Sequence, residues 1–104
     1  MDIRAEIKQV LDGTRNTRAF ADVVIDNSVV IHGVRLCEKD GSRYISMPFE
    51  KWTDKNGEEK RRDVAHPISP MARSQIQTAV SEAFDAYTQT ADNHYSEEGG
   101  NENA

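Results

Sequence analysis

The chain has 104 residues, enough for one domain with a modest hydrophobic core, and its net charge of −5 argues against a protein that binds polyanions through general positive charge. Four acidic residues and no Lys or Arg lie in residues 92–104. This leaves 14 acidic against 13 basic residues in residues 1–91, a balance of −1, so any nucleic-acid site must be local.

The cysteine content and the lack of long apolar runs bear on where the protein is located. Cys37 is the only cysteine, so an internal disulfide cannot form. The N-terminus does not resemble a signal peptide, and no apolar run approaches the roughly 18 residues that cross a membrane. We therefore expect a cytoplasmic protein that has no membrane partner.

Four strands are predicted in the first half of the chain, over residues 3–8, 19–25, 29–37 and 43–47. Apolar and polar residues alternate in the first of them, and the third is rich in β-branched residues. Short runs of Asp, Asn, Gly and Ser separate the segments, and these residues favour turns. Consecutive strands joined by such turns predict an antiparallel meander.

Strict alternation assigns the residues of the middle strands to two faces. In the third strand, one face is expected to carry Val30, His32, Val34 and Leu36. The other face of that strand is expected to carry Val29, Ile31, Gly33 and Arg35. The side of the sheet that faces solvent or a partner is then expected to include Phe20, Val24, Val29 and Ile31.

Residues 49–62 form a polar, charged segment after the fourth strand, which Pro48 limits. Asn56-Gly57 is a strong hairpin-turn pair, so this segment is predicted to fold back on itself as two arms. The second arm is predicted to run through Arg61 to Ala65 as a short fifth strand.

A helix is predicted from Met71 to about Ala91. Ser69 is suited to cap its first turn, and Pro70 is tolerated at the first helical position. Apolar residues recur at steps of three and four, which places them on one face of the helix. They are Ala72, Ile76, Ala79, Val80, Ala83, Phe84, Tyr87 and Ala91.

Together these elements predict an α+β fold, an antiparallel β-meander of four to five strands with one long C-terminal helix packed on one face. Residues 1–91 are predicted to form a single domain. Residues 92–104 are acidic, polar and contain glycine, so we expect them to be a disordered tail.

Three motifs carry a resemblance to a known family, most specifically a Met-Pro pair followed later by Asp, a hydrophobic residue and Ala-His-Pro-Ile. The motifs are Val30-Ile31-His32-Gly33-Val34-Arg35-Leu36, Ile45-Ser46-Met47-Pro48 and Arg62-Asp63-Val64-Ala65-His66-Pro67-Ile68-Ser69. With Ile76-Gln77-Thr78-Ala79-Val80, they make the chain similar over residues 3–88 to the stage V sporulation protein G (SpoVG) family of bacterial septation regulators.

The resemblance implies a small dimeric α+β protein that binds DNA, and in some members RNA. It implies action in gene regulation, cell division or septation, and sporulation. It also implies that nucleic acid contacts the basic segment after Met-Pro and the start of the C-terminal helix. Residues 49–62 are longer than the usual family segment, and Lys51-Trp52 stands where a Lys-Arg pair is usual.

The candidate nucleic-acid-binding residues are the basic side chains of these two regions and one aromatic residue. Lys and Arg neutralise phosphates, and an aromatic ring can stack on an unpaired base. The phosphate-contact candidates are Lys51, Lys55, Lys60, Arg61, Arg62 and Arg73, and the stacking candidate is Trp52. Residues 50–62 also hold four carboxylates, which leaves a charge of only +1, so an ordinary solvated hairpin is the alternative interpretation.

No group of residues has catalytic or metal-ligand spacing. His32, His66 and Cys37 do not follow a metal-binding pattern, and no Ser-His-Asp set or glycine-rich phosphate loop is present. We therefore predict a protein that is not an enzyme and that uses no cofactor, metal or small-molecule substrate. The competing hypothesis is a protein-interaction module that docks a division or regulatory partner through its sheet face or edge.

Overall fold

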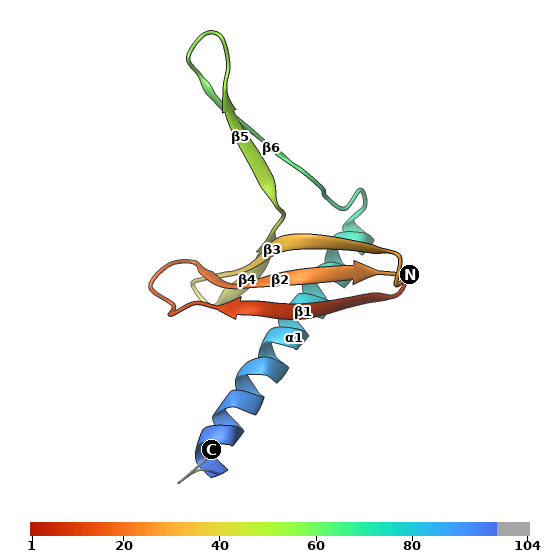
Figure 1. The fold of residues 1–104 in the computed structure, drawn as a ribbon, viewed down its shortest axis with the longest axis vertical. Coiled ribbons are helices and arrows are strands. Elements are labelled where there is room, and N and C mark those ends of the chain that lie inside the picture. Colours follow the sequence, from red (N-terminus) through yellow and green to blue (C-terminus); the bar gives the residue numbers. More distant parts are fainter. Residues whose placement is uncertain (98–104) are drawn as a thin grey trace.

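The structure is a computed structural model that describes the backbone of residues 1–97 and the side chains of residues 1–89. Its elements are β1 (Ile3–Val10), β2 (Thr17–Ile25), β3 (Val29–Lys39), β4 (Ser42–Ser46), β5 (Phe49–Thr53), β6 (Glu59–Asp63) and α1 (Pro70–Glu97). Strands β1 to β4 form one antiparallel sheet in chain order, and β5 pairs with β6 in a second sheet. Helix α1 packs against the four-stranded sheet (Figure 1), and the predicted α+β class is confirmed.

A tight turn at Asp40-Gly41 fixes the pairing of β3 with β4. Both residues have positive φ angles, 55° and 83°, which form the turn type whose twist matches that of antiparallel strands. With this two-residue turn, Arg35 lies opposite Ser46. The same register later brings Arg35 close to the start of β5.

Strand β3 contains a bulge at Gly33. Ala21 of β2 pairs with Val34, but Val23, two residues further along β2, pairs with Ile31, so β3 holds one extra residue here. Gly33 has a φ of 78°, a conformation that glycine adopts without the steric cost of a Cβ atom.

This bulge corrects the predicted assignment of the third strand to two faces. Ile31 packs against the core on the same side as Val34 and Leu36. His32 instead lies on the opposite, exposed side, where its Nδ1 is 3.1 Å from Oδ1 of Asp22. Because the extra residue breaks the two-residue period, strict alternation placed Ile31 on the wrong face.

The hydrophobic core lies between the four-stranded sheet and α1. Its largest fully buried side chains are Val23, Val34, Leu36 and Val80. The other buried members of the cluster are Ala19, Ala21, Ile45, Met47 and Ile76. The face of the sheet away from α1, here called the outer face, is not covered by any other element of the described chain.

Helix α1 begins as its sequence predicts. The Oγ of Ser69 accepts a hydrogen bond of 3.1 Å from the backbone N–H of Ala72, which satisfies one of the free amides of the first turn. Ile76, Val80 and Phe84 follow at steps of four and face the core.

The C-terminal end of α1 differs from the prediction. The helix runs to Glu97 rather than ending near Ala91, so residues 92–97 of the predicted disordered tail have helical backbone. Residues 98–104 lie outside the described part of the chain. Tyr87 belongs to the predicted apolar stripe, yet its side chain is 51% exposed.

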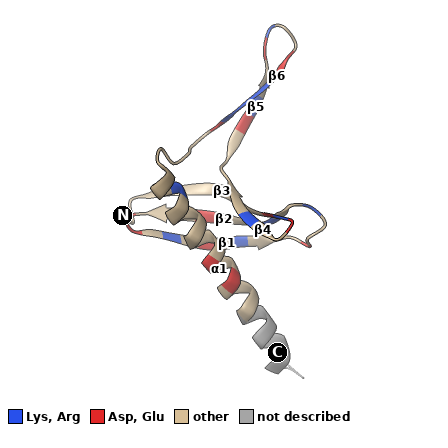
Figure 2. Ribbon diagram, turned by 180° about the vertical axis from the view of Figure 1, so that it is seen from behind, with Lys and Arg blue, Asp and Glu red and all other residues tan. Residues whose placement is uncertain are grey.

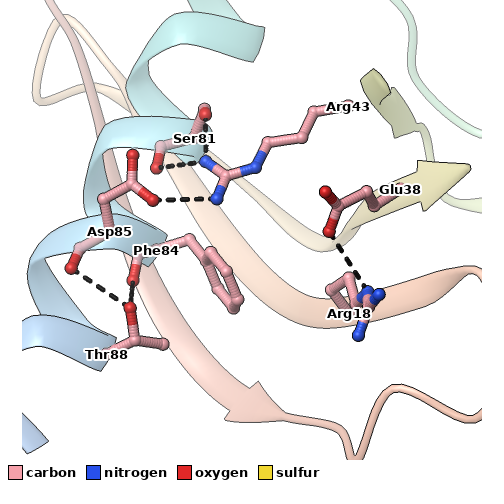
Figure 3. Close-up of polar contacts among 7 residues, drawn as sticks. All are labelled: Arg18, Glu38, Arg43, Ser81, Phe84, Asp85 and Thr88. Carbon is pink, nitrogen blue, oxygen red and sulfur yellow. Dashed lines mark hydrogen bonds and ion pairs between the residues drawn. The ribbon is translucent and has the colours of Figure 1, made fainter. Parts of the chain in front are cut away.

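A polar clamp on Arg43 attaches α1 to β4 (Figure 3). The guanidinium of Arg43 donates to Oγ of Ser81 at 2.7 Å and to Oδ1 of Asp85 at 2.9 Å, and it lies 5.2 Å from the ring centre of Phe84. The hydrogen bond to Asp85 raises the pKa of Arg43. Nε2 of Gln77 donates to the carbonyl of Arg43 at 3.1 Å, so the backbone of β4 is held as well.

The hairpin of β5 and β6, here called the arm (residues 49–63), projects from the sheet (Figure 1). Met47 is buried just before it, and the N–H of Val64 donates to the carbonyl of Pro48 at 2.8 Å, so the chain leaves and returns at one point. The predicted fifth strand over residues 61–65 is therefore β6, which pairs only with β5 and not with the main sheet.

Candidate nucleic-acid interface

The turn at the tip of the arm is organised by Asp54. Its Oδ1 accepts hydrogen bonds of 2.9 Å from the backbone N–H groups of Asn56 and Glu58, and its carbonyl accepts one from Gly57. Gly57 has a φ of 83°, whereas Asn56 does not have a positive φ. The turn therefore spans residues 54–57, and it is not the two-residue Asn56-Gly57 turn that the sequence predicts.

The pairing of β5 with β6 sorts the arm's side chains onto two faces. Directly paired residues share a face, and successive residues of a strand alternate between faces. The Phe49 face, as named here, carries Phe49, Lys51, Thr53, Glu59, Arg61 and Asp63. The Trp52 face carries Glu50, Trp52, Lys60 and Arg62.

On the Trp52 face the basic groups are paired with carboxylates. Nε of Arg62 lies 2.7 Å from Oε1 of Glu50, and Nζ of Lys60 lies 3.2 Å from Oε1 of Glu58. The guanidinium of Arg62 also lies 5.6 Å from the ring centre of Trp52, which is 44% exposed. This face is therefore close to neutral, with one aromatic ring open to solvent.

On the Phe49 face the basic groups surround an aromatic ring. The guanidinium carbon of Arg61 lies 4.2 Å from the ring centre of Phe49, and Nζ of Lys51 lies 5.9 Å from it. Arg35 of β3 approaches the same ring at 5.3 Å and also lies 5.4 Å from the ring of Phe20. Within residues 1–89, none of these three cations forms an ion pair.

Arg35 is the one cation of this cluster that the sequence analysis did not predict as a binding residue. It lies between Val34 and Leu36, which are both buried, so it points to the outer face of the sheet. The Asp40-Gly41 turn was the signal that could have found it, because a two-residue turn places Arg35 opposite Ser46, three residues before Phe49.

The remaining two predicted residues lie elsewhere. Lys55 is exposed in the turn at the tip of the arm. Arg73 is exposed in the first turn of α1. The seven predicted residues thus divide among the two faces of the arm, its tip and the helix start.

The basic side chains of this arrangement can bind anions. Among these residues, no three His, Cys, Asp or Glu side chains gather closely enough to hold a metal ion. No stretch of the described helix is long and apolar enough to span a bilayer.

Comparison with known proteins identifies the family. The SpoVG family model matches residues 1–86. This chain belongs to the SpoVG family. It is 38% identical over 84 residues to a protein of Desulforudis audaxviator, a match that covers 81% of this chain and 88% of the relative. A relative from Fusobacterium nucleatum is 35% identical over 86 residues, covering 81% and 87%. Each is named "Putative septation protein SpoVG".

Proposed function

We propose that this SpoVG-family protein binds nucleic acid, DNA or RNA, through its arm and regulates gene expression in septation and sporulation. The observation that carries the proposal is the arm itself, a projecting two-stranded ribbon with five Lys and Arg residues (Figure 2). The major groove of B-DNA admits a two-stranded β-ribbon, and basic side chains supply the attraction to phosphates.

The mechanism is reversible, stoichiometric binding with no chemical step. Lys51, Lys55 and Arg61 have no carboxylate partner in the described structure, so they can replace the counterions of a phosphate backbone without first breaking an ion pair. Lys60 and Arg62 must first break an ion pair with a carboxylate, so their contacts with phosphate contribute less binding free energy. Arg73 supplies a further cation from the start of α1.

A salt series tests this function. Binding to a mixed-sequence 30-nucleotide DNA, as a single strand and as a duplex, is measured by fluorescence anisotropy at several salt concentrations. The wild type is expected to bind, with an affinity that falls steeply as salt rises. Lys51→Gln/Arg61→Gln should lower the slope of log affinity against log salt by about 1.4–1.8, because roughly 0.7–0.9 is lost per phosphate contact.

A charge-matched variant serves as the control. Lys60→Gln/Arg62→Gln removes the same charge from the Trp52 face, where both groups are already ion-paired, so its slope should change less. Absence of wild-type binding to both DNA probes and to the matching RNA would refute the function. Equal slopes for the two double variants would refute the preference for the Phe49 face.

We also propose that the protein acts as a cytoplasmic homodimer, which presents two arms to one nucleic acid. Two-fold symmetry would double the number of phosphate contacts without any new side chain. Sedimentation equilibrium should give twice the monomer mass of 11.7 kDa, and a concentration-independent monomer would contradict this part of the proposal.

A second candidate function is docking of a protein partner on the outer face of the sheet. Val30 and Tyr44 are exposed there, and the relatives' shared name refers to septation. A partner that is retained after nuclease treatment and lost on Val30→Asp would favour this function. Retention of the partner by Val30→Asp, or its loss with the nucleic acid, would count against it.

A further inference from the structure

We propose that Arg35, a residue of the main sheet, contacts the nucleic-acid backbone, so that the binding surface runs from the Phe49 face of the arm onto the outer face of the sheet. This inference rests on the proposed function, and it specifies which face of the molecule the nucleic acid contacts. The nucleic acid then lies across the base of the arm, on the side of the sheet opposite α1, and does not contact the tip alone.

The first support is the way Arg35 is held. Its guanidinium lies 5.4 Å from the ring of Phe20 and 5.3 Å from the ring of Phe49, so two aromatic residues from different sheets restrain one cation. Contacts of this kind attract a guanidinium without using its N–H donors. In the described structure, Arg35 makes no side-chain hydrogen bond or ion pair, so its donors are available to a ligand.

The second support is local charge. Arg35, Lys51 and Arg61 gather around the ring of Phe49, and like charges held close together repel one another. Asp63 lies opposite Phe49 on the ladder but is in no ion pair with any of the three. A bound phosphate would relieve this repulsion, because it places negative charge among the three cations.

The third support is the contrast between the two faces of the arm. The Trp52 face neutralises its cations with Glu50 and Glu58, whereas the Phe49 face leaves its cations without carboxylate partners. The Phe49 face has two carboxylates of its own, Glu59 and Asp63, yet neither forms an ion pair with the cations of that face in the described structure. Those cations can therefore take a phosphate as partner without first losing a carboxylate.

The position of Phe49 also limits what this surface can recognise. With Arg61 only 4.2 Å from its centre, the ring supports a cation and does not offer a free face to a base. The surface is therefore expected to contact the sugar-phosphate backbone, and such contacts carry no sequence information directly. Arg35 is expected to affect affinity for all sequences alike.

The test compares Arg35→Gln with Arg4→Gln. Arg4 is an exposed arginine at the other end of the outer face, opposite Val24 and far along the strand from Phe20, so it controls for the loss of one positive charge. With the 30-nucleotide single strand and its duplex as probes, Arg35→Gln should lower affinity roughly 5-fold at 0.1 M salt. It should lower the salt slope by about 0.7–0.9, while Arg4→Gln leaves both unchanged.

Phe20→Leu tests whether the restraint of Arg35 by the Phe20 ring contributes to binding, separately from the charge of Arg35. This variant keeps the charge of Arg35 and removes one ring that restrains it, so affinity should fall while the salt slope stays at the wild-type value. Circular dichroism melting curves confirm that each variant is folded.

The outcomes distinguish the role of Arg35 from the proposed nucleic-acid binding on which it rests. If the wild type binds and Arg35→Gln behaves like Arg4→Gln, the role of Arg35 is refuted and the proposed function stands. If Arg35→Gln weakens binding without changing the slope, Arg35 only supports the arm, and the contact is refuted. If the wild type binds no probe, both the function and the contact fail.

Discussion

The body of the molecule, formed by β1 to β4 and α1, differs from the arm in what holds it together. The body contains every side chain of the buried core cluster except Met47, which lies between β4 and the arm. In the arm no side chain is fully buried, and all of β6 is exposed. The body is stabilised by removal of apolar surface from water, and the arm by cross-strand pairs and by the attachment of its base.

This difference separates the part of the molecule that supplies most of the stability, the body, from the part proposed to bind nucleic acid, the arm. An isolated two-stranded hairpin is marginal in water, so the arm can open locally at a smaller free-energy cost than global unfolding. Polar substitutions on the arm should leave the body folded, because no side chain of residues 49–63 belongs to the buried core cluster. Substitutions should therefore separate cleanly into those that unfold the protein and those that change binding.

Leu36→Ala is the variant expected to lower the stability of the body most. Leu36 is fully buried in β3 between the sheet and α1, and deleting its branched side chain leaves a cavity. We expect the free energy of unfolding to fall by about 2–5 kcal/mol, as measured by urea denaturation. A loss below about 1 kcal/mol would show that the sheet and helix are not the stabilising unit.

Two glycines with the same backbone conformation give a matched comparison between body and arm. Gly33 in the β3 bulge and Gly57 in the arm turn have φ angles of 78° and 83°, and a Cβ atom would clash with nothing at either position. Gly33→Ala should cost about 1–2 kcal/mol of global stability, because its strain lies in the sheet.

Gly57→Ala imposes similar strain in a segment that can open alone. Its effect on global unfolding should be smaller than that of Gly33→Ala. Faster amide hydrogen exchange should be confined to residues 49–63. Equal losses in urea denaturation would mean that the arm and the body unfold as one unit, and the comparison drawn above would be wrong.

Much of the body could be predicted from the sequence because its signals are local. The alternation in β1 and β2, the Ser69-Pro70 helix start and the steps of four from Ile76 each lie in one continuous segment. The face of Ile31 could not be predicted, because a bulge depends on how β3 pairs with β2, and Gly33 alone does not fix that register.

The candidate site was predicted less completely, because its contacts join segments that are far apart in the sequence. The hairpin and its basic residues follow from composition and turn residues. The sorting of Lys51 and Arg61 onto one face required the register of β5 with β6, which the true turn at residues 54–57 sets. The contact of Arg35 with Phe49 joins two sheets, and the Asp40-Gly41 turn signals it only indirectly, by placing Arg35 opposite Ser46.

Trp52→Ala tests the Trp52 face of the arm, where both cations are ion-paired, and should have the smallest effect on stability. The ring is 44% exposed and lies 5.6 Å from the guanidinium of Arg62, so the free energy of unfolding should change by less than about 0.5 kcal/mol. If the ring stacks on an unpaired base, affinity for the 30-nucleotide single strand should fall at least roughly 5-fold, since stacking contributes about 1–3 kcal/mol per base. Affinity for the duplex, whose bases are already stacked, should change less than about 2-fold. Equal losses on the two probes would assign Trp52 to the support of Arg62, and no loss on either would leave recognition to the Phe49 face alone.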